Sequence, residues 1–229
     1  MINWKVIIDN KLPGAVNMQK DLDLFNNCKE PTLRIYGWNP PCISLGYSQD
    51  INEYIYVEKA KALGWDTVKR PTGGGIVFHN SDEVTYSVVC PLEVMPKGAM
   101  EAYYYISEKI VLALSKLGVK SEIRSTKSEG NSKFEIRNSK SELCFATARE
   151  FEITVDGRKL VGSAQKRNRT TMLQHGSIQV AKNNIDILGA LKNGSDTRAC
   201  LDSIITIEEI LKKLPSFNEI SAALTSVFQ

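Results

Sequence analysis

Residues 67–79, Thr-Val-Lys-Arg-Pro-Thr-Gly-Gly-Gly-Ile-Val-Phe-His, place three consecutive glycines between two segments of strand-like composition. Glycines give up side-chain contacts and cost backbone entropy, so three in a row need a reason. One reason is a tight turn between adjacent strands, and the other is close approach of a ligand to backbone N–H groups. The spacing fits neither the Walker loop nor the dinucleotide fingerprint, because a strand follows the glycines. The loop alone slightly favours a turn.

Over the rest of the chain, the sequence predicts strands and helices without a regular β-α-β rhythm, which favours an α+β fold. Strands are expected at 4–9, 32–36, 43–46, 84–89, 151–155, 159–165 and 172–180. Helices are expected at 17–28, 51–63, 99–117, 206–214 and 218–228. Asn17 is the expected cap of the first helix, and Asp156-Gly157 the turn of a hairpin. We expect one domain over residues 1–229, with a polar insertion at 121–141.

The composition excludes several classes of protein. A formal net charge of +3 falls short of the concentrated basic surface of a nucleic-acid binder. No apolar run reaches membrane-spanning length, and residues 1–10 lack the regions of a signal peptide, so we expect a cytoplasmic protein with no membrane partner. Five cysteines without a CxxC pair, together with only two histidines, argue against a metal centre or a disulfide framework.

Cys144 and Lys159 are the candidates for nucleophilic chemistry. A thiol with its ordinary pKa near 8.5 is only a few per cent thiolate at neutral pH, and a nearby ammonium favours the thiolate. Lowering that pKa by two units corresponds to about 2.7 kcal/mol. Cys144 precedes the expected hairpin and Lys159 begins its second strand, so the two ends need not be far apart. The alternative, a small buried cysteine, is favoured by residue chemistry alone.

Three further segments are candidates for lining a pocket. His79 ends the strand after the glycines, where a lone histidine is more often a hydrogen-bonded structural group than a base. Gly162-Ser163-Ala164-Gln165 and Gln174-His175-Gly176-Ser177 place small residues inside strand-like sequence. Such runs suggest a surface that a ligand approaches closely, and tight sheet packing explains them nearly as well.

Read together, five segments resemble the lipoate–protein ligase, octanoyltransferase and biotin ligase superfamily. They occur in family order between Trp4 and Val180, and they are 33–38 with 44–49, 70–79, 85–89, 157–167 and 173–178. The resemblance implies a biotin/lipoate ligase-like catalytic fold, with a central mixed, mainly antiparallel sheet flanked by helices.

Within that superfamily, Cys144-Phe145 stands fifteen residues before Lys159, as in the cysteine-dependent, ligase-like octanoyltransferases. Gly75 and the residues 146–150 depart from the transferase pattern. The main alternative is an ATP-dependent lipoate–protein ligase acting through lipoyl-AMP, for which alone ATP and magnesium would be needed. A second alternative is a non-catalytic protein that binds lipoyl domains.

The transferase resemblance implies two-step chemistry without a cofactor or metal. We also expect a monomer that binds no nucleic acid. Cys144 would take octanoyl from octanoyl-acyl carrier protein and pass it to a lysine of a lipoyl-domain protein, either the glycine-cleavage carrier protein or a dehydrogenase acyltransferase subunit. Lys159 would assist Cys144. The implied substrate-binding residues are Arg70, Gly73, Gly74, Gly75, His79, Gly162, Ser163, Ala164, His175 and Gly176.

Overall fold

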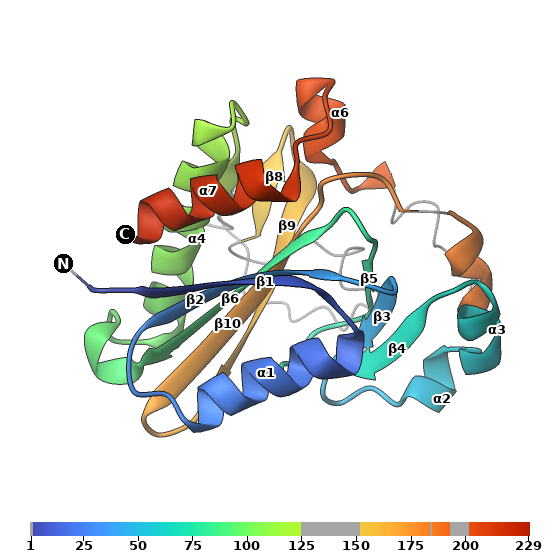
Figure 1. Cartoon of the computed structure of the whole chain (residues 1–229), viewed down its shortest axis with the longest axis horizontal. Helices are drawn as coiled ribbons and strands as arrows, with labels where there is room; N and C mark the ends of the chain where they lie inside the picture. Colours follow the sequence, from blue (N-terminus) through green and yellow to red (C-terminus); the bar gives the residue numbers. More distant parts are fainter. Residues whose placement is uncertain (1, 125–151, 184, 193–201) are drawn as a thin grey trace, which may run out of the picture.

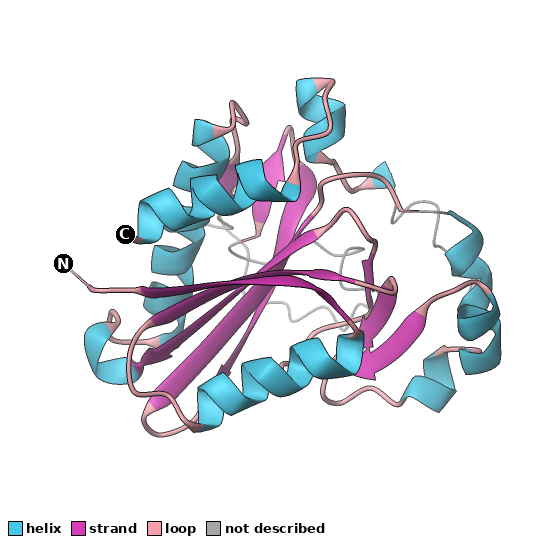
Figure 2. Cartoon of the chain, viewed as in Figure 1, coloured by secondary structure: helices cyan, strands magenta, loops and turns pink. Residues whose placement is uncertain are grey.

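The structure is a computed structural model that describes residues 2–124, 152–183, 185–192 and 202–229. Its strands form a large sheet and a small one (Figure 2). The strands of the large sheet are β1 (Lys5–Leu12), β2 (Thr32–Trp38), β6 (Val84–Pro91), β7 (Glu122–Ile123), β8 (Ile153–Val155), β9 (Arg158–Arg167) and β10 (Thr171–Ile178). The strands of the small sheet are β3 (Cys42–Leu45), β4 (Asp66–Lys69) and β5 (Val77–His79).

The large sheet has the order β1-β2-β6-β10-β9-β8-β7. Only the β1–β2 pair is parallel among these seven strands, and the other neighbours are antiparallel. The small sheet has the order β4-β3-β5 and is also mixed. The expected α+β fold with a mixed, mainly antiparallel central sheet is therefore confirmed.

Helices cover the large sheet on both sides. They are α1 (Gly14–Asn26), α2 (Ile51–Tyr54), α3 (Val57–Ala62), α4 (Ala99–Lys116), α6 (Ile207–Leu211) and α7 (Phe217–Phe228), with 3-10 turns at Leu92–Val94 and Ile185–Ala190. In Figure 1, α4 and α7 lie on one side of the large sheet and α1 on the other, with α2 and α3 beside the small sheet. In the part of the chain that the structure describes, no helix has the length and apolar content to cross a membrane.

The two faces of the large sheet differ in chemistry because side chains alternate along each strand. On β2, Leu33 and Ile35 enter the apolar core under α4 and α7, where Ile106 lies. Arg34 and Tyr36 take the alternate positions and hydrogen-bond to α1. Every residue of β2 is buried, since both faces are covered.

Two details of the expected element pattern are corrected by the structure. The first helix begins at Gly14, so Asn17 lies buried within it and caps nothing. The expected helix 51–63 is two helices, because Ile55 adopts an extended conformation and forms a bridge with Leu191. The segment 121–141 begins with strand β7, which pairs with β8, and its residues from 125 onward lie outside the described ranges.

Candidate functional site

A cavity of about 380 Å³, counted to its open mouth, lies between the polar face of the large sheet, α1 and the small sheet. Both sheets and α1 contribute to its wall, which is formed by Met18, Tyr36, Trp38, Ser44, Arg70, Val77, His79, Thr85, Gly162, Ser163, Ala164, His175, Gly176 and Ser177.

Seven of the residues that the sequence singled out meet at this cavity: Arg70, His79, Gly162, Ser163, Ala164, His175 and Gly176. Five of them come together because β9 and β10 pair with each other, which sets Ala164 opposite His175 and Ser163 opposite Gly176. Arg70 and His79 come from the small sheet and the loop that follows β4. Gly73, Gly74 and Gly75 are not among the described residues of the wall. Their role in substrate binding remains a prediction.

The glycine loop is shaped by Arg70. Arg70 donates from Nη2 to the carbonyl oxygens of Gly73 and Gly75, at 3.0 and 2.6 Å. Gly74 has a φ of +100°, a backbone conformation that favours glycine. A Cβ placed on Gly46 would lie 1.9 Å from the Gly74 carbonyl oxygen, so the two backbones touch.

A tight turn between adjacent strands is the wrong interpretation of this loop. The loop joins β4 to β5, and β3 lies between those two strands in the small sheet. It therefore has to cross the end of β3, where Gly46 follows. The glycines allow this close crossing of backbone over backbone.

His79 lies in a buried chain of hydrogen bonds on the small sheet. Its Nδ1 is 2.7 Å from Glu83 Oε1, and its Nε2 is 2.7 Å from Ser44 Oγ. Arg70 Nη1 donates to the same Ser44 Oγ, at 3.2 Å, and to the Ser44 carbonyl oxygen. The Trp38 ring stacks on the imidazole, with 3.9 Å between ring centroids. These contacts fix both the position and the orientation of the imidazole.

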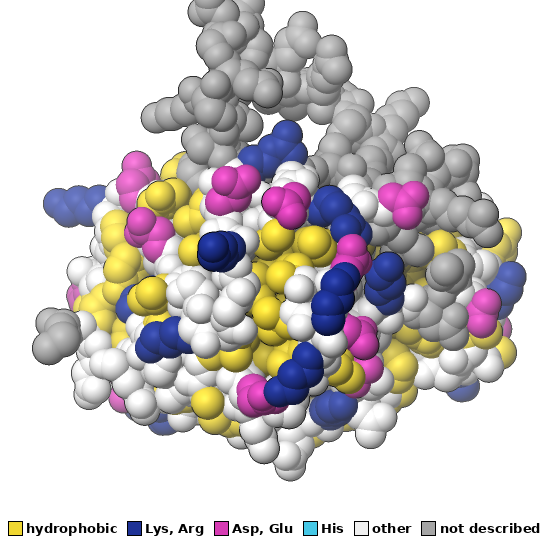
Figure 3. Space-filling view, turned by 90° about the horizontal axis from the view of Figure 1, so that it is seen from above, with side chains coloured by type: hydrophobic (Ala, Val, Ile, Leu, Met, Phe, Trp, Pro, Cys, Tyr) yellow, Lys and Arg dark blue, Asp and Glu magenta, His cyan; other side chains and the backbone are white. Residues whose placement is uncertain are grey.

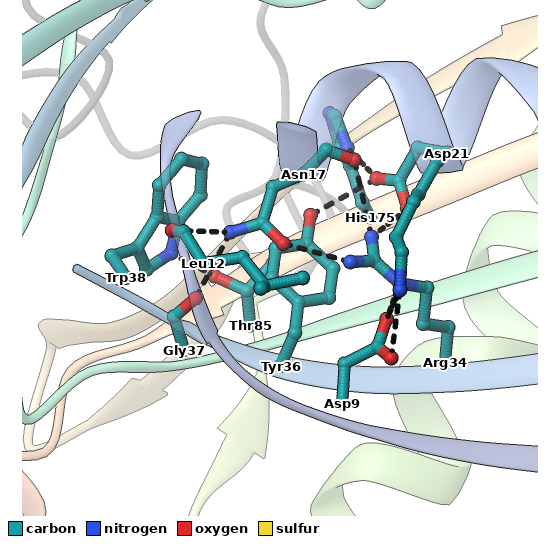
Figure 4. Close-up of polar contacts among 11 residues, drawn as sticks. Asp9, Leu12, Asn17, Asp21, Arg34, Tyr36, Gly37, Trp38, Thr85 and His175 are labelled. Atoms are coloured by element: carbon teal, nitrogen blue, oxygen red, sulfur yellow. Dashed lines mark hydrogen bonds and ion pairs between the residues drawn. The ribbon is translucent and has the colours of Figure 1, made fainter. Parts of the chain in front are cut away.

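His175 lies in a second chain, on the large sheet. Its Nδ1 is 3.1 Å from Asp21 Oδ2, and its Nε2 is 2.6 Å from Thr72 Oγ1. Asp21 is fully buried and also accepts from Arg34 Nη1, at 2.7 Å, and from the Tyr36 hydroxyl, at 3.0 Å. Figure 4 shows the side chains of Asp21, Arg34, Tyr36 and His175 converging between α1 and the sheet.

The same network continues along α1. Arg34 donates from Nε to Asp9 Oδ2, at 2.7 Å, and from Nη2 to Asn17 Oδ1, at 2.7 Å. Asn17 in turn donates to the Gly37 carbonyl oxygen. The side chain expected to cap the helix therefore attaches the helix to β2 (Figure 4).

The electrostatics of this network favour a charged Asp21 beside a neutral His175. Burial alone would raise the pKa of Asp21, but the hydrogen bond from His175 and the charge of Arg34 hold it below its ordinary value of 3.8. Burial lowers the pKa of His175 below 6.5, although Asp21 opposes this effect. A neutral imidazole at neutral pH follows.

Lys159 is buried on β9, and its Nζ donates to Glu152 Oε1. Its backbone N–H donates to the Ser203 carbonyl oxygen, which ties β9 to the segment before α6. The side chain is not part of the described cavity wall. Cys144 lies outside the described residues, so its distance from Lys159 stays a prediction.

The structure describes three of the other four cysteines, and all three have thiols with raised pKa values. Burial raises the pKa of the Cys28 thiol, raises that of Cys42 well above its ordinary value, and raises that of Cys90 to about 12. These three thiols are therefore poor nucleophiles at neutral pH. Cys200, like Cys144, lies outside the described residues. Over the described ranges, no group of three or more His, Cys, Asp or Glu side chains is placed to hold a metal ion.

The sequence-based interpretation missed most of the polar side chains around the two imidazoles. They are Asn17, Asp21, Arg34, Ser44, Thr72 and Glu83. One signal was present in the sequence: Asn17 and Asp21 are four residues apart on the helix face that also carries Met18 and Phe25. Two polar residues on the buried face of a helix predict a tertiary hydrogen-bonding role.

Comparison with known proteins gives relatives in both sequence and structure. The chain is 40% identical over 181 residues to "Octanoyltransferase LipM" of Geobacillus kaustophilus, covering 76% of this chain and 64% of that protein. It is 41% identical over 199 residues to the protein of the same name from Moorella thermoacetica, covering 84% and 71%. The chain thus spans just under two thirds of the first relative's length.

Solved structures share the fold at low sequence identity. A lipoate-protein ligase A bound with ATP superimposes with a TM-score of 0.75 at 20% identity, over 99% of this chain and 84% of that one. A bipartite lipoate protein ligase from Thermoplasma acidophilum gives 0.75 at 17% identity, over 100% and 83%. The model of the lipoyl protein ligase A/B catalytic domain matches residues 13–229, and with the relatives above it establishes that the chain belongs to this family.

Proposed function

We propose that this chain is an octanoyltransferase of protein lipoylation, with a single catalytic domain over residues 1–229. The observation that carries the proposal is the 40% identity to a relative named octanoyltransferase, over 76% of the chain. The cavity supports it, because Met18, Trp38 and Val77 offer an apolar wall to an acyl chain. We further propose that the protein acts in the cytoplasm, as a monomer.

In the first step, the Cys144 thiolate attacks the thioester carbon of octanoyl-acyl carrier protein. A bond forms between sulfur and the acyl carbon, and the carrier's phosphopantetheine leaves as a thiolate that takes a proton. The poor nucleophilicity of Cys28, Cys42 and Cys90 supports assigning this step to Cys144.

In the second step, a lysine amine of a lipoyl domain attacks the octanoyl-Cys144 thioester. The lysine ammonium loses one proton to become nucleophilic, and the nitrogen loses a second as the amide forms and Cys144 departs as a thiolate. Lys159, kept buried beside Glu152, would supply positive charge to the thiolate and to the oxygen that becomes negative. No metal or nucleotide enters either step.

An intact-mass measurement after incubation with octanoyl-acyl carrier protein tests this proposal. We expect one octanoyl adduct on the wild-type protein, none on Cys144→Ser, and an unchanged adduct on the matched control Cys200→Ser. An adduct that survives in Cys144→Ser would contradict the assignment of the nucleophile.

The same assay separates the two alternative functions. Acyl transfer that requires ATP and free lipoate, and that persists in Cys144→Ser, would make the protein a lipoate ligase. Binding of a lipoyl domain without transfer under either condition would make it a docking protein. A panel with the glycine-cleavage carrier protein and the dehydrogenase acyltransferase subunits as acceptors then defines the acceptor.

A further inference from the structure

The two histidines of the chain, His79 and His175, occupy the same kind of hydrogen-bonded arrangement on opposite walls of the cavity. Each imidazole contacts a buried carboxylate through Nδ1 and a buried hydroxyl through Nε2. The two sets are Glu83–His79–Ser44 and Asp21–His175–Thr72. The resemblance between them is in chemistry alone, because they stand on different sheets.

The partners of each imidazole decide where its proton lies. An ionised carboxylate only accepts hydrogen bonds, so Nδ1 of His175 must donate to Asp21. In a neutral imidazole, Nε2 is then an acceptor, and the Thr72 hydroxyl must donate to it. Burial lowers the pKa of His175, which agrees with the neutral form that this tautomer requires.

Thr72 belongs both to the Asp21–His175–Thr72 set and to the glycine loop. Thr72 is 1% exposed and lies two residues after Arg70. Its carbonyl oxygen accepts from the Tyr47 N–H, at 2.9 Å, which attaches the loop to the segment after β3. Its hydroxyl attaches the loop to β10 through His175, at 2.6 Å. The loop is thus held to both sheets at one residue.

Asp21 makes this attachment rigid. Its two carboxylate oxygens accept from Arg34, Tyr36 and His175, and all four side chains are buried. Such a fully occupied carboxylate permits one orientation of the imidazole. The position of Thr72 is therefore set from α1, by way of β10.

We propose that His175, oriented by Asp21, is a positioning residue that holds Thr72 and with it the Arg70–Gly75 loop against the cavity. The effect on acyl transfer rests on the proposed function, whereas the effect on the loop does not. His175 also lines the cavity, and the proposal concerns the separate contact that its Nε2 makes with the loop through Thr72.

The tautomer is tested first, by ¹⁵N NMR of the imidazoles in protein labelled at histidine. Only two imidazoles contribute, and His79→Gln assigns the pair. We expect His175 at pH 7.5 to be neutral with its proton on Nδ1, and Asp21→Asn to change its Nδ1 and Nε2 shifts. A proton on Nε2, or a charged imidazole, would overturn the proposal.

The loop is tested next, by hydrogen exchange of the amides in residues 70–75 without substrate. We expect Thr72→Val to speed their exchange about tenfold, the effect of losing one buried hydrogen bond. Thr72→Ser keeps the hydroxyl and should exchange as the wild type does. Ser221→Ala is the matched control, because it removes another buried hydroxyl, bonded to the Phe217 carbonyl oxygen of α7. Unchanged exchange in Thr72→Val would also overturn the proposal.

Kinetics then separate this proposal from the proposed function. With octanoyl-acyl carrier protein, Thr72→Val should raise KM about tenfold with a smaller change in kcat, and Thr72→Ser should restore it. A change in kcat alone would contradict positioning. A wild-type protein that forms no octanoyl adduct would contradict the proposed function. The tautomer and the exchange rates would still decide the role of His175.

Discussion

The two faces of the large sheet are built from alternate residues of the same strands, yet they depend on different interactions. On β2, Leu33 and Ile35 pack into the core under α4 and α7. Arg34 and Tyr36 face α1 and share the carboxylate of Asp21. The apolar face is stabilised by area removed from water, which does not depend on direction. The polar face is stabilised only while each donor keeps its acceptor.

The two faces therefore respond differently to substitution. An apolar face tolerates small losses of volume, because neighbouring side chains relax around them. A buried network of charges fails when one member is removed, because its partner is left unpaired. On the face seen in Figure 3, Lys and Arg side chains are interspersed with Asp and Glu side chains, and exposed charges of this kind contribute little to stability.

The largest expected effect is that of acid, because it acts on three groups of the polar face together. The pKa of His175 is below 6.5, so the unfolded chain binds a proton that the folded chain does not. Stability is therefore present above pH 6.5 and falls as the pH drops from there. The pKa values of Asp9 and Asp21 in the folded chain are below 3.8, so a second loss of folding stability begins below that pH.

Urea unfolding followed across the pH range measures this acid effect. In His175→Asn, which cannot titrate, the loss between pH 6.5 and 4 should be weaker than in the wild type. An equally steep loss in that variant would place the acid sensitivity elsewhere.

The next largest effect is expected for Arg34→Ala, which leaves Asp21 and Asp9 without their guanidinium partner. Breaking a buried ion pair from one side costs about 3–5 kcal/mol. Urea unfolding at pH 7.5 measures the loss. The double variant Arg34→Ala/Asp21→Asn should lose less than the sum of the single variants, because no charge is then stranded at position 21. Strict additivity would argue against coupling across the polar face.

Gly176→Ala tests a tightly packed position of the cavity wall on β10. An added Cβ would lie 2.5 Å from Ser163 Oγ and 2.5 Å from Tyr86 Cε1. We expect overpacking to cost about 1–3 kcal/mol in urea unfolding. Adduct formation should also slow, since Ser163 and Gly176 both line the cavity. Ala164→Ser, at a cavity position on the neighbouring strand β9, is the matched control for stability.

The smallest effect is expected for Ile35→Val on the apolar face. Removing one methyl group from a buried isoleucine costs about 0.5–1.5 kcal/mol. The rate of adduct formation at 25 °C should not change, because Ile35 contacts the core and not the cavity. A slower rate in this variant would show that the two faces are coupled more tightly than their contacts suggest.

Local chemistry made much of the fold predictable from the sequence. The hairpin at Asp156-Gly157 was expected because that dipeptide suits a turn with positive φ at both positions, and the structure has φ values of 50° and 74°. The helix at 99–117 was expected from its apolar period and is observed at Ala99–Lys116. Asn17 misled the prediction because a residue that suits a cap also suits a buried tertiary network.

The site was predictable only in part, because its contacts join distant residues. The segments around His79, Ser163 and His175 were recognised as candidates, and the cavity brings them together. The hydroxyl partners of the two imidazoles could not be recognised, since Thr72 meets His175 across 103 positions and Ser44 meets His79 across 35. Such pairs depend on the order of strands in two sheets, which no local pattern encodes.

Arg70 has a consequence for redesign of the cavity. Its guanidinium binds the carbonyl oxygens of Gly73, Gly75 and Ser44 at once, a task for a planar fork of donors that a lysine cannot reproduce. The residue is therefore a fixed part of the scaffold as well as a part of the wall. Engineers who wish to admit a different ligand should leave Arg70 alone and vary Met18 and Val77, whose apolar side chains line the same wall.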